Sequence, residues 1–580
     1  MLLWSGTMYV RATTRKNKDG STVRYLQLAH NEWEAATGTS RPQVLHSFGR
    51  EDQLDRGAIE RLVASLAKLL DPAAALRATS GSELTFLASR PMGGAHALDG
   101  LWHRIGIDTV MKKLLAGRRL DPAAERVLFA LVANRALAPS SKLAATRWIE
   151  HDNHIPGLAS TSDDACYRAM DWLLKIEEKL AEEVYWQVAD LLNLEVDLLF
   201  FDTTSTYFET GEADTPAARD DHGRRLQQEA EPDEGTDDDS GKSFRAYGKS
   251  KDHRPDLPQV VIGMAVTRTG IPIRVWSWPG NTGDQALIRQ VREDLRAWKL
   301  TRVVWVADRG FASEQNRRFL QRAGGHYILG EKIRSGSPAA QAALSRQGRY
   351  AHVADNMQVK QVQLADTADR FVICHNPDQA TRDAAIRADL LAQLEEAIKD
   401  SDKLKPLKRA ELRGKLSTKP GLHRFLRATP GGLLRVDKAA IKAEERLDGK
   451  FLLRCSDPHL SAEDIATGYK QLLEVERGWR DMKTIIDLRP VYHRKEDRIR
   501  AHVLLCWLAL LLIRIAETTC DDTWLNLREE LERIHVGTFT GPAGTFRQRT
   551  ETSPAQRAIL AKLGVTEPKR IITLEPGTTA

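Results

Sequence analysis

The first part of the chain alternates apolar and polar residues, which indicates a small antiparallel sheet. Three alternating runs, MYVRATT, TVRYLQLAH and RPQVLHSFG, fall within residues 8–48 and are separated by the turn-forming segments KNKDG and ATGTS. A period of two is typical of strands that bury one face. A helical pattern follows from about Asp55 to Leu70. We therefore predict a sheet and one helix within residues 1–90.

Residues 91–195 change to the spacing of amphipathic helices. Apolar residues recur at intervals of three and four in ERVLFALVANRAL, SKLAATRWIE, CYRAMDWLLK and EEKLAEEVYWQVADLL. This interval matches the 3.6-residue turn of a helix, so that one side of each segment is apolar. We therefore predict a separate domain of several packed helices here.

A different pattern begins with the continuous apolar run LLFF, which ends at Asp202 and is typical of a central strand covered on both faces. The segments VVIGMAVT and IPIRVWSW then predict a hairpin over 260–278. A helix over about 284–298, the strand VVWVA ending at Asp308, a short helix and the strand HYILG follow. This order of elements predicts an α/β fold that resembles the ribonuclease H-like fold. Asp202 and Asp308 would stand at the ends of its first and fourth strands.

The predicted core occupies residues 196–330 and 461–535 and is interrupted by an inserted α+β domain at residues 331–460. The insertion contains the strand-like segments MQVKQVQLA, RFVICH and KFLLRCS and a charged helical stretch. One helix is predicted from about Ser461 to Ile486, with a capping pair at its start. The apolar run VLLCWLALLLI is predicted to be a buried helix, because it is shorter than the roughly 20 residues that cross a bilayer. Residues 536–580 are predicted to be a C-terminal tail.

The composition permits a nucleic-acid partner and favours a reducing compartment. Lys and Arg number 85 against 79 Asp and Glu, a net charge of +6, and much of the acidity lies in EAEPDEGTDDD at 229–239, which predicts a solvated loop. The five cysteines are scattered without a CxxC pair, which argues against a thiolate zinc site. No signal-peptide core opens the chain. We expect a cytoplasmic protein of a bacterium, associated with the nucleoid and without a membrane partner.

Two strand-terminal aspartates indicate ligands for a hard cation, since Mg²⁺ prefers carboxylate oxygens. Two such ions about 3.5–4 Å apart could activate an attacking water or 3′-hydroxyl and stabilise the leaving oxygen of a phosphodiester. The last predicted helix offers Glu474 and Glu476 as the third carboxylate. Steps of three and four residues place Glu476 on an inward-facing apolar stripe, whereas Glu474 falls on the charged face. That stripe comprises Ile465, Tyr469, Leu472, Glu476, Trp479 and Lys483.

These motifs together resemble a large family of bacterial insertion-sequence transposases, the insertion-sequence-four type. Tyr469, Glu476 and Lys483 fit its Y-x2-R-x3-E-x6-K signature, with Leu472 at the position of the signature Arg. Asp308-Arg309-Gly310-Phe311 resembles the second-aspartate motif of the family. Asp202 followed by two threonines resembles the first. Arg477 or Arg480 would take the place of the missing Arg.

The resemblance implies a DNA transposase of the three-carboxylate (Asp, Asp, Glu) type. Asp202, Asp308 and Glu476 would be the catalytic residues and would hold two Mg²⁺ ions, for which Mn²⁺ would substitute. The enzyme would cleave double-stranded DNA at the ends of its element and join 3′-hydroxyls to target DNA. Tyr469 and Lys483 would contact phosphates near the scissile bond, and the bringing together of two ends implies a homodimer.

Further cations are candidate DNA ligands. Lys249, Lys251 and Arg254 could follow a DNA backbone, although a solvated loop that balances the neighbouring acidic run is an equal alternative. Arg494 and Arg498 follow the catalytic helix, where phosphate contact is favoured. The loop PGNTGD, which ends at Asp284, is predicted first as a turn with a helix cap, and a role near the active site is the lesser alternative.

Two other functions compete with a transposase. One is a non-catalytic DNA-binding repressor derived from a transposase, which would bind element ends without cutting them. The other is a ribonuclease H-like nuclease or resolvase, which would cut DNA without joining it. Recognition of the element ends is assigned to the N-terminal sheet and the helical region, because both precede the predicted core and the sheet carries a basic cluster that comprises Arg11, Arg15, Lys16 and Lys18.

Overall fold

The computed structural model describes residues 8–576 except 19, 35–37, 71–83, 117–122, 193–197, 221–222, 227–242, 297, 299–302, 335, 490 and 542–543. The predicted acidic loop at 229–239 lies outside the described residues. The chain divides into two compact units. One unit comprises residues 1–89, 535–551 and 568–580, and the other comprises residues 90–534 and 552–567.

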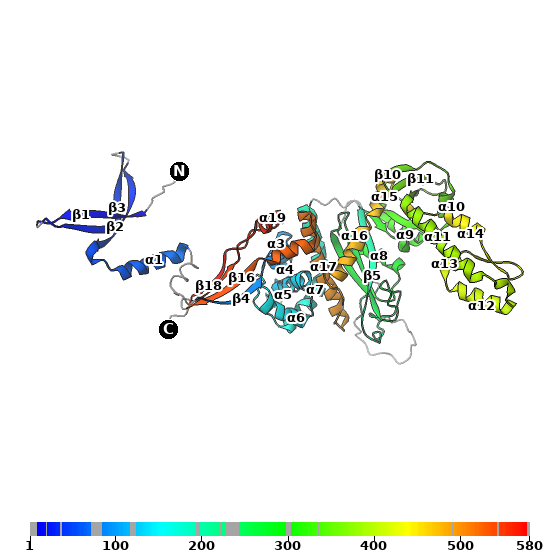
Figure 1. The fold of residues 1–580 in the computed structure, drawn as a ribbon, viewed down its shortest axis with the longest axis horizontal. Coiled ribbons are helices and arrows are strands. Elements are labelled where there is room, and N and C mark those ends of the chain that lie inside the picture. The colour runs from blue at the N-terminus through cyan, green and yellow to red at the C-terminus, as the bar shows by residue number, and fades with distance from the viewer. Residues whose placement is uncertain are drawn as a thin grey trace. The chain divides into compact units, whose positions relative to one another are not determined.

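The first unit contains two small sheets (Figure 1). Strands β1 (Met8–Lys16), β2 (Thr22–Glu34) and β3 (Thr39–Arg50) form the predicted antiparallel meander, which α1 (Arg56–Leu70) follows. The second sheet has the order β18-β17-β16-β4. Its strands are β4 (Thr85–Pro91), β16 (His535–Gly541), β17 (Gly544–Arg549) and β18 (Ile571–Pro576).

The C-terminal segment is therefore not the tail that the sequence predicted. Residues 536–541 pair with 544–549, and 544–548 pair with 571–576, in antiparallel register. The alternation in HVGTFTG and GTFRQR carries the strand signal, and it buries Val536 and Phe546. Between these strands, α19 (Pro554–Lys562) begins with a capping box at Ser553.

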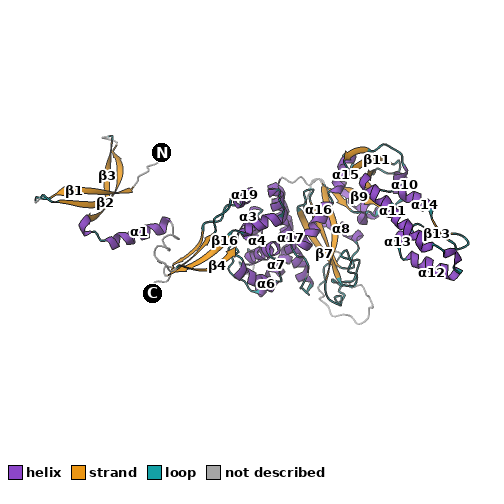
Figure 2. Ribbon diagram, viewed as in Figure 1, coloured by secondary structure: helices purple, strands orange, loops and turns teal. Residues whose placement is uncertain are grey.

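The second unit begins with the predicted helices (Figure 2). They are α3 (Gly93–Arg104), α4 (Ile107–Leu115), α5 (Ala124–Leu137), α6 (Lys142–Arg147) and α7 (Asp163–Leu192). Near the end of the chain α17 (Glu496–Cys520) packs against α5, α7 and β7, and α18 (Trp524–Glu532) follows. By length and composition α17 could cross a membrane, but 94% of its most apolar 18-residue window is buried inside the protein. The predicted buried helix is thus confirmed.

The central sheet follows the predicted order of elements. The order along the chain is β5 (Leu198–Tyr207), β6 (Gln259–Val266), β7 (Pro272–Pro279), α8 (Asp284–Arg296), β8 (Val304–Ala307), α9 (Glu314–Leu320) and β9 (His326–Glu331). Strand β5 pairs antiparallel with β6 and parallel with β8, and β8 pairs parallel with β9. The strands are apolar on both faces because helices cover them.

The segment at 331–460, predicted as an inserted α+β domain, contributes strands to the central sheet. Its strands β10 (Ala351–Ala354), β11 (Met357–Gln363), β12 (Arg370–His375) and β15 (Lys450–Cys455) continue the central sheet to nine strands. Strand β15 pairs with β9, so the insertion extends an edge of the core. A helical lobe lies between β12 and β15. It contains α11 (Pro377–Ile398), α12 (Pro406–Ser417), α13 (Pro420–His423), β13 (Leu426–Ala428), β14 (Leu434–Val436) and α14 (Lys438–Glu445).

The last predicted core helix is broken into α15 (Ala462–Lys470) and α16 (Leu473–Thr484). At the break, backbone hydrogen bonds join residues three apart: the amides of Leu472, Glu474 and Val475 donate to Tyr469, Gln471 and Leu472. In such a 3₁₀-like turn each residue rotates the chain about the helix axis by a larger angle than in an α-helix. The inward face of α16 is shifted as a result, and it presents Val475, Gly478, Trp479 and Met482 to the core.

Candidate active site

Asp202 and Asp308, here called the carboxylate pair, lie side by side on neighbouring parallel strands. Phe201 pairs with Ala307, so the residues that follow them stand at the same level of β5 and β8. Such strands are about 4.8 Å apart. Strand β5 does not end at Asp202, as the sequence predicted, but continues to Tyr207. The intervening Thr-Thr-Ser-Thr segment contains β-branched residues that favour a strand, and they pair with β6.

The carboxylate pair concentrates negative charge at a half-buried place. The pKa of Asp202 is raised to about 6, chiefly by burial and to a smaller extent by the charges of Asp308 and Asp284, while the charge of Lys251 opposes the rise. Like charges at close range disfavour the ionised form of each carboxyl group. A bound cation would relieve this repulsion.

Asp284 is a third acid beside the carboxylate pair, and the sequence favoured only a capping role for it. The hydroxyl of Thr203 donates a hydrogen bond of 2.8 Å to Asp284 Oδ1. The Lys251 ammonium lies 3.7 Å from Asp284 Oδ2 and 3.8 Å from Asp202 Oδ1. Lys251 therefore points toward the acids. The loop PGNTGD is an ordinary turn signal, and only the sheet brings it to this place.

Tyr469 of α15 contacts the carboxylate pair from the helix that covers it. Its hydroxyl donates a hydrogen bond of 3.1 Å to Asp308 Oδ1, and burial together with the charge of Asp308 raises the tyrosine pKa. The hydroxyl therefore stays protonated and can only donate to the carboxylate. Gly330 makes the approach possible, since a Cβ at that position would lie 2.5 Å from the Tyr469 hydroxyl.

Lys483 of α16 reaches the neighbouring strand β5, next to Asp202. Its ammonium lies 2.8 Å from Thr204 Oγ1 and 2.8 Å from Asp252 Oδ1. Arg489 lies 3.1 Å from the other oxygen of Asp252. Asp252 therefore fixes two cations beside the strand that carries Asp202.

Glu476 is not on the inward face where the sequence placed it. Its side chain is exposed, because the tight turn before α16 brings Val475 inward instead. Among the described residues no hydrogen bond or ion pair joins Glu476 to the carboxylate pair. Glu474 packs beside Gly270, where a Cβ would lie 2.8 Å from its Oε2. The structure thus brings Asp202 and Asp308 together, and it places Glu476 on the solvent side of α16.

The donor set suits Mg²⁺, whose usual protein ligands are one or two carboxylates supplemented by water and substrate phosphates. The carboxylate pair supplies such oxygens, and the ammonium of Lys251 shows that a positive charge is favoured beside Asp202. In the part of the chain that the structure describes, no group of three or more His, Cys, Asp or Glu side chains is arranged so that it could hold a metal ion by itself. Further ligands would therefore come from Glu476, Asp284 or the substrate.

Comparison with known proteins gives the site its context. Residues 234–512 match the family model of the transposase DDE domain, and residues 10–76 match that of the N-terminal domain of IS1634 family transposases. The chain carries a transposase DDE domain. Asp308 and Glu476 lie inside the matched part of the DDE domain, and Asp202 precedes it. The N-terminal match is to the IS1634 family. This family differs from the insertion-sequence-four type, which the signature of Tyr469, Glu476 and Lys483 resembles.

No curated protein matches the chain in sequence. A solved structure, the cryo-EM structure of a piggyBac transposase synaptic complex with hairpin DNA, resembles the chain with a TM-score of 0.34 and 11% sequence identity. That likeness covers 77% of this chain and 81% of the other.

Of the other cations that the sequence predicted as DNA ligands, some are exposed and others pair with acidic side chains. Lys249 and Arg494 are exposed. Arg254 pairs with Asp256 at 2.8 Å, and Arg477 pairs with Glu517 at 3.1 Å. The guanidinium of Arg480 is exposed. Arg498 lies against α7, where it pairs with Asp171 at 2.6 Å and stacks over the Tyr167 ring.

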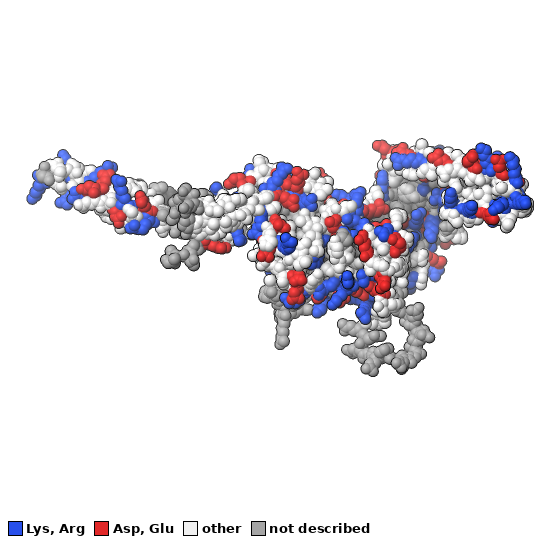
Figure 3. Space-filling model, turned by 60° about the horizontal axis from the view of Figure 1, so that its bottom comes forward, with Lys and Arg blue, Asp and Glu red and all other residues white. Residues whose placement is uncertain are grey.

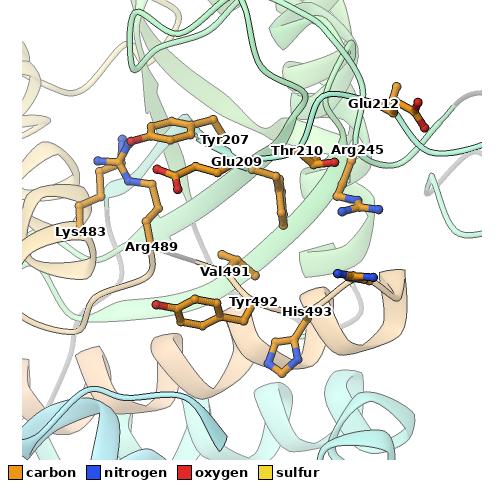
Figure 4. A pocket seen from close by; sticks show the side chains of 13 residues that line it. Tyr207, Glu209, Thr210, Glu212, Arg245, Lys483, Arg489, Val491, Tyr492 and His493 are labelled. Atoms are coloured by element: carbon orange, nitrogen blue, oxygen red, sulfur yellow. The ribbon is translucent and has the colours of Figure 1, made fainter.

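A cavity of about 860 Å³ opens beside Lys483. Figure 4 shows Tyr207 and Glu209, from the end of β5 and the loop beyond it, on one side, and Arg489, Val491 and Tyr492 on the other. The Tyr492 side chain is 71% exposed. Because Lys483 both lines the cavity and contacts Thr204, the cavity is adjacent to the strand that carries Asp202.

Proposed function

We propose that the protein is a DNA transposase that cleaves at the ends of an insertion sequence and joins the 3′-hydroxyls to target DNA. Asp202, Asp308 and Glu476 are its catalytic residues and hold two Mg²⁺ ions, for which Mn²⁺ substitutes. The observation that carries the proposal is the carboxylate pair at one level of parallel strands β5 and β8, with one member inside the matched DDE domain. When bound, such ions activate the attacking oxygen and stabilise the leaving oxygen.

Two contacts support Glu476 as the third acid. Tyr469, seven residues before it, bonds to Asp308, and Lys483, seven residues after it, bonds to Thr204. Glu476 therefore lies on the helical segment between two side chains that both reach the carboxylate-bearing strands. Its exposure leaves the carboxylate open to an ion and to DNA, which a ligand shared with substrate requires.

The neighbouring side chains position the reacting groups. Tyr469 holds one oxygen of Asp308 and so orients the carboxylate. Lys251 neutralises Asp202 and Asp284 at 3.8 and 3.7 Å. Lys483, held by Asp252, presents its ammonium to a phosphate next to the scissile bond, which adds electrostatic stabilisation where charge develops.

The DNA strand approaches along the cations that surround the DDE domain. Lys483 and Arg489 line the cavity next to β5 together with Arg494, and Lys249 and Arg480 are exposed. Charges of this kind neutralise phosphates and give salt-dependent affinity. Lys251, Arg254, Arg477 and Arg498 complete the proposed set of DNA ligands, whereas Tyr469 acts through Asp308, to which its hydroxyl donates.

The N-terminal meander recognises the element ends, since Arg15, Lys16 and Lys18 are exposed on or beside β1. The enzyme acts as a homodimer on double-stranded DNA in the bacterial cytoplasm, at the nucleoid. Deleting residues 1–90 would abolish end binding and leave sequence-independent binding to DNA. Unchanged end binding would contradict this assignment.

Product analysis separates the three functional classes. The full chain is incubated with Mg²⁺ and a labelled duplex that carries the terminal repeat of its element, and cleaved and joined products are resolved by size. A transposase gives both products, and neither forms with EDTA. Cleavage without joined products indicates a nuclease or resolvase, and a shifted but intact duplex indicates a repressor.

A further inference from the structure

A strongly basic segment lies in the helical lobe, far along the chain from the proposed catalytic residues. Residues 403–427 contain nine Lys or Arg residues and a single acid, Glu411. The preceding helix α11 is the reverse, with five Asp or Glu residues and two Arg within residues 377–398. Figure 3 shows the resulting gathering of Lys and Arg side chains at the outer end of this lobe, where α12 lies. The acidic and basic residues of the lobe are therefore concentrated in different segments of the chain.

Five of these cations have no acidic partner. Lys403, Lys408 and Arg424 form ion pairs with Asp400, Glu411 and Glu444. The remaining side chains that are exposed make no ion pair with any described residue, and they are Lys405, Arg413, Lys415, Lys419 and Arg427. Unpaired like charges repel one another and destabilise the folded state. Their concentration in one segment thus indicates a role in binding an anion.

A small core holds the basic surface in place. Leu394, Leu416, Leu422 and Phe425 pack together beneath α12 and α13. Because Leu416 is buried, the turns of α12 present their cations from a fixed helix. The surface therefore has a defined shape before any ligand binds, which lowers the cost of ordering it.

The surface is also hollowed beside α12. A groove of about 420 Å³ is lined by Arg409, Arg413 and His423, together with the small residues Ala410, Gly414 and Gly432. A Cβ at Gly414 or Gly432 would meet nothing within 4 Å, so both backbones are open to a large ligand. The Nε of Arg409 is buried and has no hydrogen-bond partner in the described structure. The groove thus combines the cationic side chains of Arg409 and Arg413 with room for a polymer backbone.

We propose that α12 and the segment that leads to β13, here called the α12 surface, bind the phosphate backbone of double-stranded DNA without reading its sequence. Cations distributed along one helix and its flanking turns match the regular charge of a duplex. The α12 surface rests on the proposed function, because it would hold DNA on which the carboxylate pair acts. It is formed by residues separate from those that cut the strand.

The test measures binding of the full chain to a labelled duplex of arbitrary sequence, by fluorescence anisotropy in EDTA over a range of salt concentrations. The variant replaces Lys405, Arg413, Lys415 and Lys419 by Gln. We expect at least tenfold weaker binding. If each side chain contacts one phosphate, the slope of log affinity against log salt falls by about 3.6, because each contact contributes about 0.9. Thermal unfolding should match that of the wild type.

A matched control loses the same charge elsewhere in the second unit, through Gln at the exposed positions Lys175, Lys179, Arg296 and Arg533. Equal loss of affinity in both quadruple variants would overturn the proposal, as would no loss in the first. Anionic vesicles that bind the wild type where the duplex does not would overturn it as well. DNA binding is measured in EDTA and therefore does not depend on cleavage. A wild-type protein that binds DNA through the α12 surface but never cuts it would contradict the proposed function and still support the role of the α12 surface.

Discussion

The hydroxyl of Tyr469 donates a hydrogen bond of 3.1 Å to Oδ1 of Asp308, across 161 positions of the chain. A partner that orients a metal-binding carboxylate typically changes activity by roughly 10- to 100-fold when it is removed. We expect Tyr469→Phe to slow Mg²⁺-dependent cleavage by this amount and to destabilise the fold by only about 1 kcal/mol. DNA affinity should change little. Tyr492→Phe, at an exposed tyrosine, is the control, and equal slowing in both variants would contradict a positioning role.

Gly330 is expected to matter only because Tyr469 passes over it. A Cβ at Gly330 would lie 2.5 Å from the tyrosine hydroxyl and 3.2 Å from the backbone nitrogen of Arg309. Gly330→Ala should therefore displace Tyr469, slow cleavage and cost about 1–3 kcal/mol of stability through overpacking. Combined with Tyr469→Phe, its effect on the cleavage rate should be less than additive. Full additivity would show that the two residues act independently.

Arg514 is expected to be a major determinant of stability behind the catalytic helix. It is 2% exposed and contacts Asp481 at 2.6 Å and Glu517 at 2.5 Å. Arg514→Met would remove the buried cation that Asp481 and Glu517 share and should cost about 3–5 kcal/mol in chemical denaturation. Arg477→Met removes a more exposed partner of Glu517 and should cost less than about 1 kcal/mol. Similar losses would contradict this account.

Lys142 should make the stability of the helical domain depend on pH. Burial, followed by the charge of Arg135, lowers its pKa from 10.5 to about 7. Other groups that face it are Cys166, His493, His502 and Cys506. Between pH 7 and 10.5 the unfolded chain binds the proton that the folded chain has lost. The contribution of Lys142 to the free energy of unfolding therefore rises with pH, by up to about 1.4 kcal/mol per pH unit.

Lys142→Met tests this dependence, because a methionine fills similar space without a charge. Denaturant unfolding is measured from pH 7 to 9 for both proteins. The wild type should gain stability relative to the variant as the pH rises. Parallel curves for the two proteins would show that the Lys142 ammonium remains protonated in the folded state.

The sequence predicted those elements whose signal is local. The apolar run before Asp202, the hairpin after it and the strand before Asp308 are confirmed because each has an unmistakable period or length. The strand through residues 203–207 was missed because polar threonines conceal a buried strand. The alternating signal of β16 and β17 is local and was overlooked, whereas the pairing of β16 with β4 could not be read because β4 lies more than 400 positions away.

The site was predictable only in part for the same reason. Two acids after apolar strands could be found from sequence, since parallel strands bring their ends together. Asp284 could not be assigned, because its approach depends on the packing of α8. Glu476 was misplaced because a tight turn at Leu472 changes the phase of the helix, and a count of three- and four-residue steps assumes an unbroken helix.

The most direct test of the central claim is the rate of Mg²⁺-dependent cleavage of an element-end duplex by Glu476→Gln, compared with wild type, Glu474→Gln and Asp284→Asn. Each variant must bind the duplex as the wild type does in EDTA. We predict that cleavage and joined products are lost with Glu476→Gln, as with Asp202→Asn and Asp308→Asn, and are retained with Glu474→Gln. Cleavage that persists in Glu476→Gln and disappears in Asp284→Asn would contradict the account and assign Asp284 as the third metal ligand.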